Sequence, residues 1–348
     1  MSDSSWIAVD AMGGDEGLAV MLAGVARARR QFEGMKFLLV GDESAIRDGL
    51  KTHPNLSDNA EIVHAPEVVG SSETAGKALR RARTTSIGVA IDCVKQGRAG
   101  VAVSAGNTGA LMAMAKVALR TMPGIDRPAL AAMLPSLGDN DVVMLDLGAN
   151  TECDARNLMQ FAVMGAAYAR ILHDLELPRV RLLNIGTEEL KGTEALRDAQ
   201  AMLRAADHLP LRFDGFIEAN SLGRGEADVI VSDGFSGNIA LKTAEGTARF
   251  IADLIRRSFT SSLRSKMGFL LSRPALHLLR HSLDPNDRNG AVFLGLNGTV
   301  VKSHGGTSAE GFANAIAVAA KLARGRITTR IREDLARIAP PPQAAVAE

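Results

Sequence analysis

Two short segments of the chain carry glycines, hydroxyls and amides in the same order. Residues 103–110 read VSAGNTGA and residues 231–238 read VSDGFSGN, so they are identical at four of eight positions and share a hydroxyl at a fifth. Each follows a β-branched run and precedes an apolar stretch, which predicts a strand, a glycine loop and a helix. Such a loop directs backbone N–H groups at an anion, with the positive end of the helix dipole behind them. The chain is therefore expected to bind a phosphate-like group and to do chemistry on it.

The first segment offers neutral donors to such an anion. It has neither the lysine of a Walker A loop nor the spacing of a dinucleotide-binding loop. The alternative is that Asn107 or Thr108 only caps the helix that follows. We expect the anion to be bound by Ser104, Gly106, Asn107, Thr108 and Gly109.

The second segment adds a carboxylate, Asp233, and an amide, Asn238, to the same pattern. A carboxylate in a loop after a strand can take or give a proton, or orient a neighbouring group. Its alternative role is to close an Asx turn. We predict that Asp233 and Asn238 are catalytic and that Ser236 binds substrate.

A further loop, residues 10–15, reads DAMGGD and places two glycines between two carboxylates. Glycines permit a tight turn and allow a ligand to approach the backbone closely. The alternative is a plain turn in which Asp15 caps the next helix. We expect Asp10, Gly13, Gly14 and Asp15 to contribute to the binding site.

Amide side chains follow two more predicted strands. Asn150 either donates to an oxyanion or caps the next helix, and the residues alone leave both roles open. Asn184 stands in a similar place and is predicted to be catalytic, while Lys191 lies within reach and can neutralise a bound anion. Cys153 has no histidine near it in the sequence, which favours an inert thiol over a nucleophile.

Short apolar runs separated by amphipathic stretches must position these residues. They predict helices at residues 17–31 and 44–51, and strands at residues 7–11, 37–41, 62–64, 101–103, 142–146, 180–184 and 229–231. Apolar strands that alternate with helices favour a largely parallel sheet covered on both faces, a three-layer α/β/α arrangement. Ligands bind beyond the carboxyl ends of such strands, and we expect Asp10, Ser104, Asp146, Asn184 and Asp233 to share that edge.

Composition excludes several classes of protein. The 348 residues carry a net charge of +1 and 4% aromatics, which argues against a nucleic-acid partner. The sequence lacks a secretory signal, a membrane span and zinc-type cysteine spacing, so we predict a cytoplasmic protein without a metal site. Residues 1–338 are expected to form a single catalytic unit, and the proline-rich residues 339–348 a disordered tail.

Residues 250–284 are amphipathic and basic. Pro274 is expected to divide this stretch into two helices. One interpretation is core or dimer packing, and the other is an in-plane anchor on anionic lipid. For the anchor, the membrane-facing residues are predicted to be Phe259, Leu263, Phe269, Leu270, Leu271 and Leu278.

Seven segments resemble, in order, those of the bacterial phosphate acyltransferases, the acyl-carrier-protein:phosphate transacylases of phospholipid synthesis. They are residues 10–15, 103–110, 148–150 (GAN), 184–186 (NIG), 216–218 (FIE), 231–238 and 303–305 (SHG). The resemblance adds His304 to the expected binding residues. It departs from the family at residues 289–295, where NGAVFLG replaces the usual GGAPLLG, and at Ala75, near which the family usually has a proline.

The resemblance implies a reaction in which acyl-acyl-carrier-protein and inorganic phosphate give acyl phosphate for phosphatidic acid synthesis. It also implies a homodimer, peripheral membrane attachment and no cofactor. The implied fold is similar to that of the isopropylmalate dehydrogenase and phosphotransacetylase group. On this basis residues 104–109 bind phosphate with Asn150 and Asn184, while Asp233, Ser236 and Asn238 serve the thioester.

Two alternatives to acyl transfer remain at the level of sequence. One is an NAD- and metal-dependent decarboxylating dehydrogenase of the same fold group, although the sequence shows no aspartate cluster at helical spacing for the metal. The other is a non-catalytic, membrane-associated acyl-binding scaffold. The two glycine loops argue against the scaffold, which has no use for them.

Overall fold

The computed structural model describes residues 6–284 and 286–338, and for residues 277–283 it describes the backbone alone. The predicted tail, residues 339–348, lies outside the described residues. The first part of the chain forms four strands and five helices: β1 (Trp6–Asp10), α1 (Gly17–Gln31), β2 (Lys36–Gly41), α2 (Glu43–Leu50), β3 (Ala60–His64), α3 (Ala75–Arg80), α4 (Ser86–Lys95), β4 (Val101–Ser104) and α5 (Thr108–Leu119).

The remaining elements follow in two groups. The middle of the chain forms β5 (Ala129–Leu134), β6 (Val142–Leu145), α6 (Ala155–His173), β7 (Arg179–Leu183), α7 (Glu194–Ala205), β8 (Arg212–Ile217), β9 (Val229–Val231) and α8 (Gly234–Thr260). The C-terminal part forms α9 (Leu263–Leu283), β10 (Ala291–Leu294), β11 (Thr299–Lys302), α10 (Ala309–Arg324) and α11 (Ile327–Ile338). Short 3₁₀ turns also occur at Pro54–Asn59 and Ala219–Ser221.

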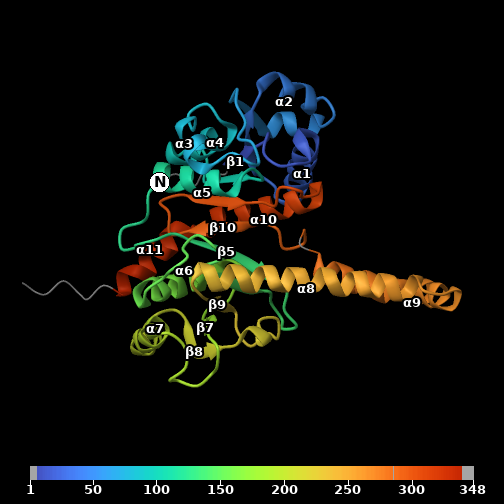
Figure 1. The fold of residues 1–348 in the computed structure, drawn as a ribbon. Coiled ribbons are helices and arrows are strands. Elements are labelled where there is room, and N and C mark those ends of the chain that lie inside the picture. Colours follow the sequence, from blue (N-terminus) through green and yellow to red (C-terminus); the bar gives the residue numbers. More distant parts are fainter. Residues whose placement is uncertain (1–5, 285, 339–348) are drawn as a thin grey trace, which may run out of the picture.

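These strands form one sheet in the order β3-β2-β1-β4-β11-β10-β5-β6-β9-β7-β8 (Figure 1). β10 pairs antiparallel with β11 and with β5, and β5 pairs antiparallel with β6. The other pairings are parallel. The predicted α/β fold with a largely parallel sheet is confirmed.

The three reversals change where the loops leave the sheet. They separate β4 from β9 in the strand order, and an odd number of reversals makes these two strands run in opposite directions. The loops that follow β4 and β9 therefore leave at opposite edges. The expectation that Asp10, Ser104, Asp146, Asn184 and Asp233 share one edge is wrong, because β5 and β10 were not among the predicted strands.

Apolar side chains of the sheet alternate between its two faces. In β1, Ile7 and Val9 pack in the core layer that includes α1, α6 and α10, whereas Ala8 packs in the layer of α4 and α5. In the second half of the sheet, Met144 and Ile230 pack against Ala240 and Leu241 of α8. Helices therefore cover both faces, as the alternation of strands and helices predicted.

The basic stretch forms a helical hairpin that extends beyond the sheet (Figure 1). α8 and α9 are joined at Ser261 and Ser262, and the rings of Phe259 and Phe269 meet edge to face with centroids 5.6 Å apart. Pro274 lies inside α9, so the predicted break at Pro274 is wrong. The helix begins where the Ser262 hydroxyl accepts from the N–H of Ser265 at 3.0 Å, as an N-cap residue does.

Candidate functional site

Asp10 joins the exits of two neighbouring strands. It ends β1 and is fully buried. The Ser104 hydroxyl at the end of β4 donates to Asp10 Oδ2 at 2.6 Å, and the N–H of Gly13 donates to Oδ1 at 3.0 Å. Ser104 also accepts from the N–H of Gly106 at 3.0 Å. Burial raises the pKa of Asp10, and the Ser104 hydrogen bond opposes that rise.

The glycines of residues 10–15 allow two loops to touch through their backbones. A Cβ on Gly13 would overlap the Asp10 carboxylate and lie 2.8 Å from the N–H nitrogen of Gly106. Gly14 has φ +99°, a conformation that favours glycine. The Asp15 N–H donates to the carbonyl of Gly305 at 2.9 Å, which brings a third strand exit against the first two.

The side chain of Asn107 caps α5 and binds the backbone of a neighbouring loop. Its Oδ1 accepts from the N–H of Ala110 at 3.0 Å, so it caps α5 as the alternative prediction had it. Its Nδ2 donates to the carbonyls of Ser71 at 2.9 Å and Glu73 at 3.0 Å. The first N–H groups of a helix have no acceptor within it. Thr108 and Gly109, which are exposed at the start of α5, are therefore placed to offer theirs to an anion.

Lys302 was missed by the sequence analysis. It ends β11 opposite Ser104, and its ammonium donates to the carbonyls of Ala105 at 3.5 Å and of Ser303. Burial lowers its pKa to about 8, while Asp15 and Asp10 oppose that shift. The signal that would have found it is the β-branched run that precedes the lysine, TVVK, which reads as a strand ending in a cation.

His304 completes this group. Its backbone N–H donates to Oδ1 of the buried Asn289 at 3.0 Å. Partial burial lowers the pKa of His304, and so does the nearby Lys302 ammonium. We call the group the β4 cluster: Asp10, Gly13, Gly14, Asp15, Ser104, residues 106–109, Lys302 and His304.

Asp146 organises the second group as Asp10 does the first. It follows β6 and is fully buried. Oδ1 accepts from the N–H groups of Leu130 at 2.9 Å and Ala149 at 3.1 Å, and Oδ2 accepts from the N–H of Asn150 at 2.7 Å. Burial raises the pKa of Asp146. The Asn150 amide donates to the carbonyl of Pro128 at 2.8 Å, and the cap of α6 is Asp154, so Asn150 is not the helix cap.

Asp233 caps α8. Its Oδ1 accepts from the backbone N–H of Ser236 at 2.8 Å and its Oδ2 from the Ser236 hydroxyl at 3.0 Å, in the Asx-type arrangement that was the alternative prediction. Asp233 is nevertheless only half-buried. The Asn238 amide donates to the carbonyl of Leu147 at 2.9 Å, which leaves its second N–H and its carbonyl oxygen for a ligand.

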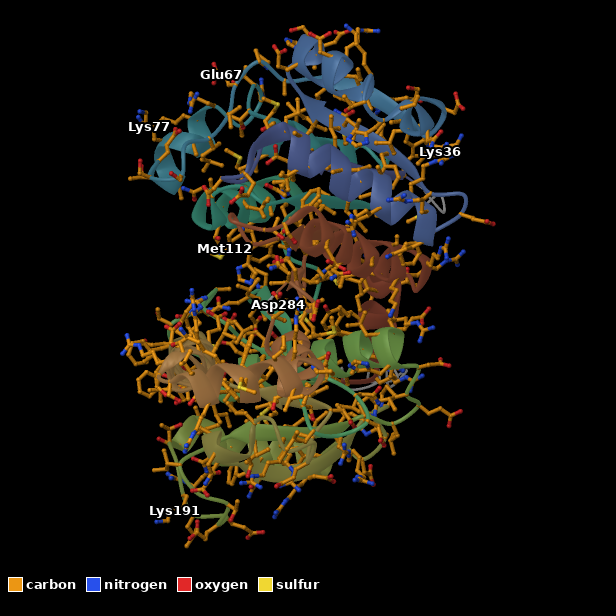
Figure 2. The ribbon with its side chains drawn as sticks, turned by 90° about the vertical axis from the view of Figure 1, so that its right-hand side faces the viewer. Lys36, Glu67, Lys77, Met112, Lys191 and Asp284 are labelled. Carbon is orange, nitrogen blue, oxygen red and sulfur yellow. The ribbon has the colours of Figure 1, made fainter. Side chains whose placement is uncertain are left out.

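Asn184 reaches the same edge as Asp233. β7 and β9 are parallel with Leu182 opposite Val231, so Asn184 and Asp233 follow neighbouring positions. The Asn184 amide donates to the carbonyl of Lys191 at 3.1 Å and closes the loop between them. The Lys191 side chain is exposed, and Figure 2 shows it at the end of the molecule far from Lys77 and Glu67. We call Asp146, Asn150, Asn184, Lys191, Asp233, Ser236 and Asn238 the β9 cluster.

Helix α8 spans the interval between the two clusters. It begins at Gly234 in the β9 cluster, and its charged residues Lys242, Glu245 and Arg249 act on the pKa of His304 in the β4 cluster. Glu245 lies eleven residues after Gly234, which corresponds to about 17 Å of helix. The loops after β4 and β9 leave at opposite edges of the sheet, so the expected phosphate set of residues 104–109 with Asn150 and Asn184 is not brought together at one strand edge.

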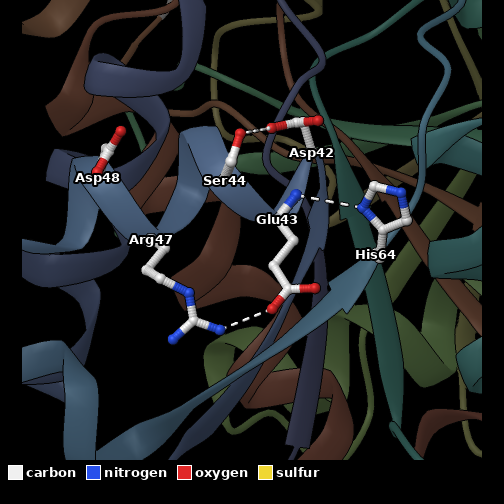
Figure 3. Close-up of a pocket in the computed structure, with 6 residues that line it drawn as sticks. All are labelled: Asp42, Glu43, Ser44, Arg47, Asp48 and His64. Atoms are coloured by element: carbon white, nitrogen blue, oxygen red, sulfur yellow. Dashed lines mark hydrogen bonds and ion pairs between the residues drawn. The ribbon is translucent and has the colours of Figure 1, made fainter.

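A separate hollow lies at the exits of β2 and β3 (Figure 3). Its lining is mostly exposed and includes the carboxylates of Asp42, Glu43 and Asp48. Arg47 there is already paired with Glu43 at 2.6 Å. This acidic lining does not favour an anion, so we place the functional site at the two clusters.

Cys153 was considered as an alternative nucleophile. Burial raises the pKa of the Cys153 thiol to about 12, which keeps it protonated and agrees with an inert thiol.

Most of the predicted membrane-facing residues lie on the surface of the α8–α9 hairpin. Phe259 is half-buried against Phe269, and the side chain of Leu278 lies outside the described residues. The other predicted membrane residues are exposed: Leu263, Phe269, Leu270 and Leu271.

No helix among residues 6–284 and 286–338 is both long and apolar enough to cross a membrane.

Comparisons with known proteins cover nearly the whole chain. A family model described as "Fatty acid synthesis protein" matches residues 6–330. A curated phosphate acyltransferase from Erythrobacter litoralis is 65% identical over 332 residues, which are 95% of this chain and 94% of that protein. One from Rhodopseudomonas palustris is 50% identical over 338 residues, 97% of each chain.

Solved structures match the fold. A phosphotransacetylase from Streptococcus pyogenes superposes with a TM-score of 0.61 at 20% identity, covering 92% of this chain and 94% of the other. The EutD phosphotransacetylase from Staphylococcus aureus gives 0.58 at 19% identity, with 91% and 94% covered. The predicted likeness to the phosphotransacetylase group is thereby confirmed at the level of fold.

Proposed function

This chain belongs to the phosphate acyltransferase family and is an acyltransferase, and on that premise we propose that it transfers a fatty acyl group from acyl carrier protein to inorganic phosphate. A phosphate oxygen attacks the thioester carbonyl carbon, a C–O bond forms, and the C–S bond breaks. The products are acyl phosphate, a precursor for phosphatidic acid, and the carrier-protein thiol, whose sulfur takes up the proton that the attacking hydrogen phosphate loses. Phosphate is already anionic and the thioester already activated, so the reaction requires neither a metal nor a redox cofactor.

We place the reacting atoms at the β9 cluster. The observation that supports this choice is that Asp233 and Asn184 follow paired positions of adjacent strands, with Asn238 making one amide hydrogen bond and the backbone of the exposed Lys191 bound to Asn184. The free N–H of Asn238 suits the developing oxyanion, and Lys191 suits the incoming phosphate. Asp233 then orients the leaving sulfur, or takes the proton that the phosphate loses and passes it to that sulfur, while Asn184 holds the Lys191 loop. Fixed positions for both reactants supply much of the rate enhancement.

The β4 cluster then takes a different phosphate. Because the loops after β4 and β9 leave the sheet at opposite edges, we assign the inorganic phosphate that attacks the thioester to the β9 cluster and not to the loop after β4. The acyl donor itself carries a second phosphate, the phosphodiester at the base of its long phosphopantetheine arm. We assign that group to the N–H groups of Thr108 and Gly109 and to the exposed hydroxyl of Thr108, with Asn107 holding their loop in place.

The α8–α9 hairpin is proposed as the membrane contact, and the enzyme as a homodimer. Support for membrane contact comes from Leu263, Leu270 and Leu271, whose exposed fractions are 81%, 68% and 82%. Exposed basic side chains on the same helices suit anionic lipid: Arg256, Arg257, Arg264, Lys266 and Arg273. The same apolar residues suit a dimer contact equally, so the two uses require separate tests.

The two alternatives to acyl transfer that the sequence left open are less well supported. The curated relatives cited above are phosphate acyltransferases over nearly their whole length. An NAD- and metal-dependent dehydrogenase and a non-catalytic acyl-binding scaffold therefore have less support than acyl transfer.

The assignment of the two clusters is tested by steady-state kinetics. Asp233→Asn and Asn238→Ala are expected to lower kcat about a hundredfold, as removal of a preset donor or of a general acid does. Thr108→Val is expected to raise KM for the acyl donor about fivefold, the loss of one hydrogen bond of about 1 kcal/mol, with KM for phosphate unchanged. Asp253→Asn, an exposed carboxylate further along α8, is the matched control.

Two results would contradict these assignments. Near-normal kcat in both β9-cluster variants would remove the reaction centre from that cluster. A rise in the phosphate KM of Thr108→Val, with the donor KM unchanged, would return inorganic phosphate to the loop after β4.

A further inference from the structure

Lys302 connects the two ligand-facing segments of the β4 cluster. Its ammonium donates to the carbonyl of Ala105 at 3.5 Å and to that of Ser303. Ala105 directly precedes the 106–109 loop, and Ser303 directly precedes His304. The Ser303 N–H also donates to the carbonyl of Ser104 at 2.9 Å. The Lys302 side chain, at the end of β11, therefore adds its ammonium to a backbone hydrogen bond that joins the same two segments, between the start of the loop and His304.

The positive charge of Lys302 also affects the electrostatics of the site. The carboxylates of Asp10 on β1 and Asp15 in the following loop both act on the Lys302 ammonium, which in turn acts on His304. The α8 side chains that act on His304 are Lys242, Glu245 and Arg249, and Lys242 and Glu245 are paired at 3.0 Å. Without the ammonium, two carboxylates would face a site assigned to an anion. Their repulsion would be strong in this partly buried setting.

We propose that Lys302 is a positioning residue for the acyl donor, which holds residues 106–109 and His304 at the spacing that binds the donor's phosphodiester and screens Asp10 and Asp15 from it. This inference rests on the proposed function, which places that phosphodiester at the β4 cluster. Lys302 itself is bound to backbone carbonyls and acts through the groups that it holds.

The inference has a pH signature with a definite sign. Lys302 is protonated below its pKa of about 8 and loses its charge as the pH rises through that value. If the uncharged form does not hold the site, KM for the donor rises about tenfold per pH unit above pH 8. An arginine at this position stays charged over the whole range.

The experiment compares Lys302→Met, Lys302→Arg and the control Lys95→Met, an exposed lysine at the end of α4. Two donors are used: an acyl thioester of acyl carrier protein, and an acyl thioester of N-acetylcysteamine, which has no phosphodiester. Lys302→Met is expected to raise KM for the carrier-protein donor about tenfold at pH 7, and to leave kcat/KM for the short donor within about twofold of wild type. Lys302→Arg is expected to keep a low KM up to pH 9, where the wild-type KM has risen.

Each outcome decides one of the two proposals. If Lys302→Met has the wild-type KM and pH profile for the carrier-protein donor, while Thr108→Val raises that KM, the inference on Lys302 is wrong and the site assignment stands. If Lys302→Met and Thr108→Val both raise KM for phosphate instead, the assignment of the phosphodiester fails. Should Lys302→Met not fold, as judged by circular dichroism, Lys302→Arg decides, because an alkaline rise in KM identical to that of wild type overturns the inference.

Discussion

At the scale of single residues, two buried aspartates organise the two clusters in the same way. Asp10 ends β1 and Asp146 directly follows β6, each is fully buried, and each accepts N–H groups from the turn that comes after it. A serine at the next strand exit completes both arrangements: Ser104 donates to the Asp10 carboxylate, and Ser232 donates to the carbonyl of Asp146 at 3.4 Å. The similarity of the two glycine loops therefore extends to the strands beside them.

Gly237 shows how tightly the second of these arrangements is packed. It lies in the first turn of α8, where a Cβ would overlap the carbonyl oxygen of Asp146 and the Ser232 hydroxyl. Gly237→Ala is expected to lower the free energy of unfolding by about 2 kcal/mol, the usual cost of forcing an atom into a packed contact. The measurement is urea unfolding followed by circular dichroism.

A second glycine of the same helix is the control for that substitution. Gly246 has no heavy atom within 4 Å of its would-be Cβ. Gly246→Ala is expected to raise the stability by up to about 1 kcal/mol, the difference in helix propensity. Equal destabilisation by the two substitutions would show that the contact at Asp146 does not set the cost.

At the scale of elements, the sequence predicted most of the strands that lead to the site residues. It did not predict β5, β10 and β11, whose antiparallel pairings reverse the strand direction within the sheet. Residues 37–41 and 142–146 were recognisable because they are continuous apolar runs of buried strands. β5 is alanine-rich, and β10 and β11 lie in a stretch interrupted by glycine and asparagine, residues 289–306, so their patterns did not stand out. Their pairings reverse the sheet, which is why the residue types at the clusters were predictable and their grouping was not.

The α8–α9 hairpin allows a direct test of the proposed membrane contact. Leu270→Glu and Leu271→Glu place charges on the exposed apolar side of α9, and each is expected to reduce binding to anionic vesicles about thirtyfold, since burying a leucine contributes about 2 kcal/mol. The measurement is flotation with vesicles of phosphatidylglycerol and phosphatidylcholine. Leu177→Glu, which replaces a leucine that is 54% exposed and lies outside the hairpin, is the control.

The same variants separate the membrane contact from a dimer contact. Size-exclusion chromatography without lipid reports the oligomeric state. Unchanged flotation together with loss of the dimer would assign the apolar surface of α9 to the subunit interface and contradict the membrane proposal.

At the scale of the whole molecule, the last part of the chain returns to complete the sheet that the first part began. β11 inserts between β4 and β10, and α10 packs against α1. α11 then packs on α6 in the other half, where Arg170 and Asp334 form a mostly buried ion pair. Since both halves depend on residues 289–338, we predict that they unfold together, although a chain of this length often unfolds in stages.

The chain contains one reporter for each half. Trp6 is its only tryptophan and lies in β1, and Tyr168 is its only tyrosine and is buried in α6. Urea transitions followed by tryptophan fluorescence and by tyrosine second-derivative absorbance are expected to coincide. Asp334→Asn should shift both midpoints by the same amount, because loss of the charge on Asp334 leaves Arg170 buried without its partner, at a cost of about 3 kcal/mol. Two separate transitions, or a shift in the Tyr168 transition alone, would show that the halves are independent folding units joined only at the sheet.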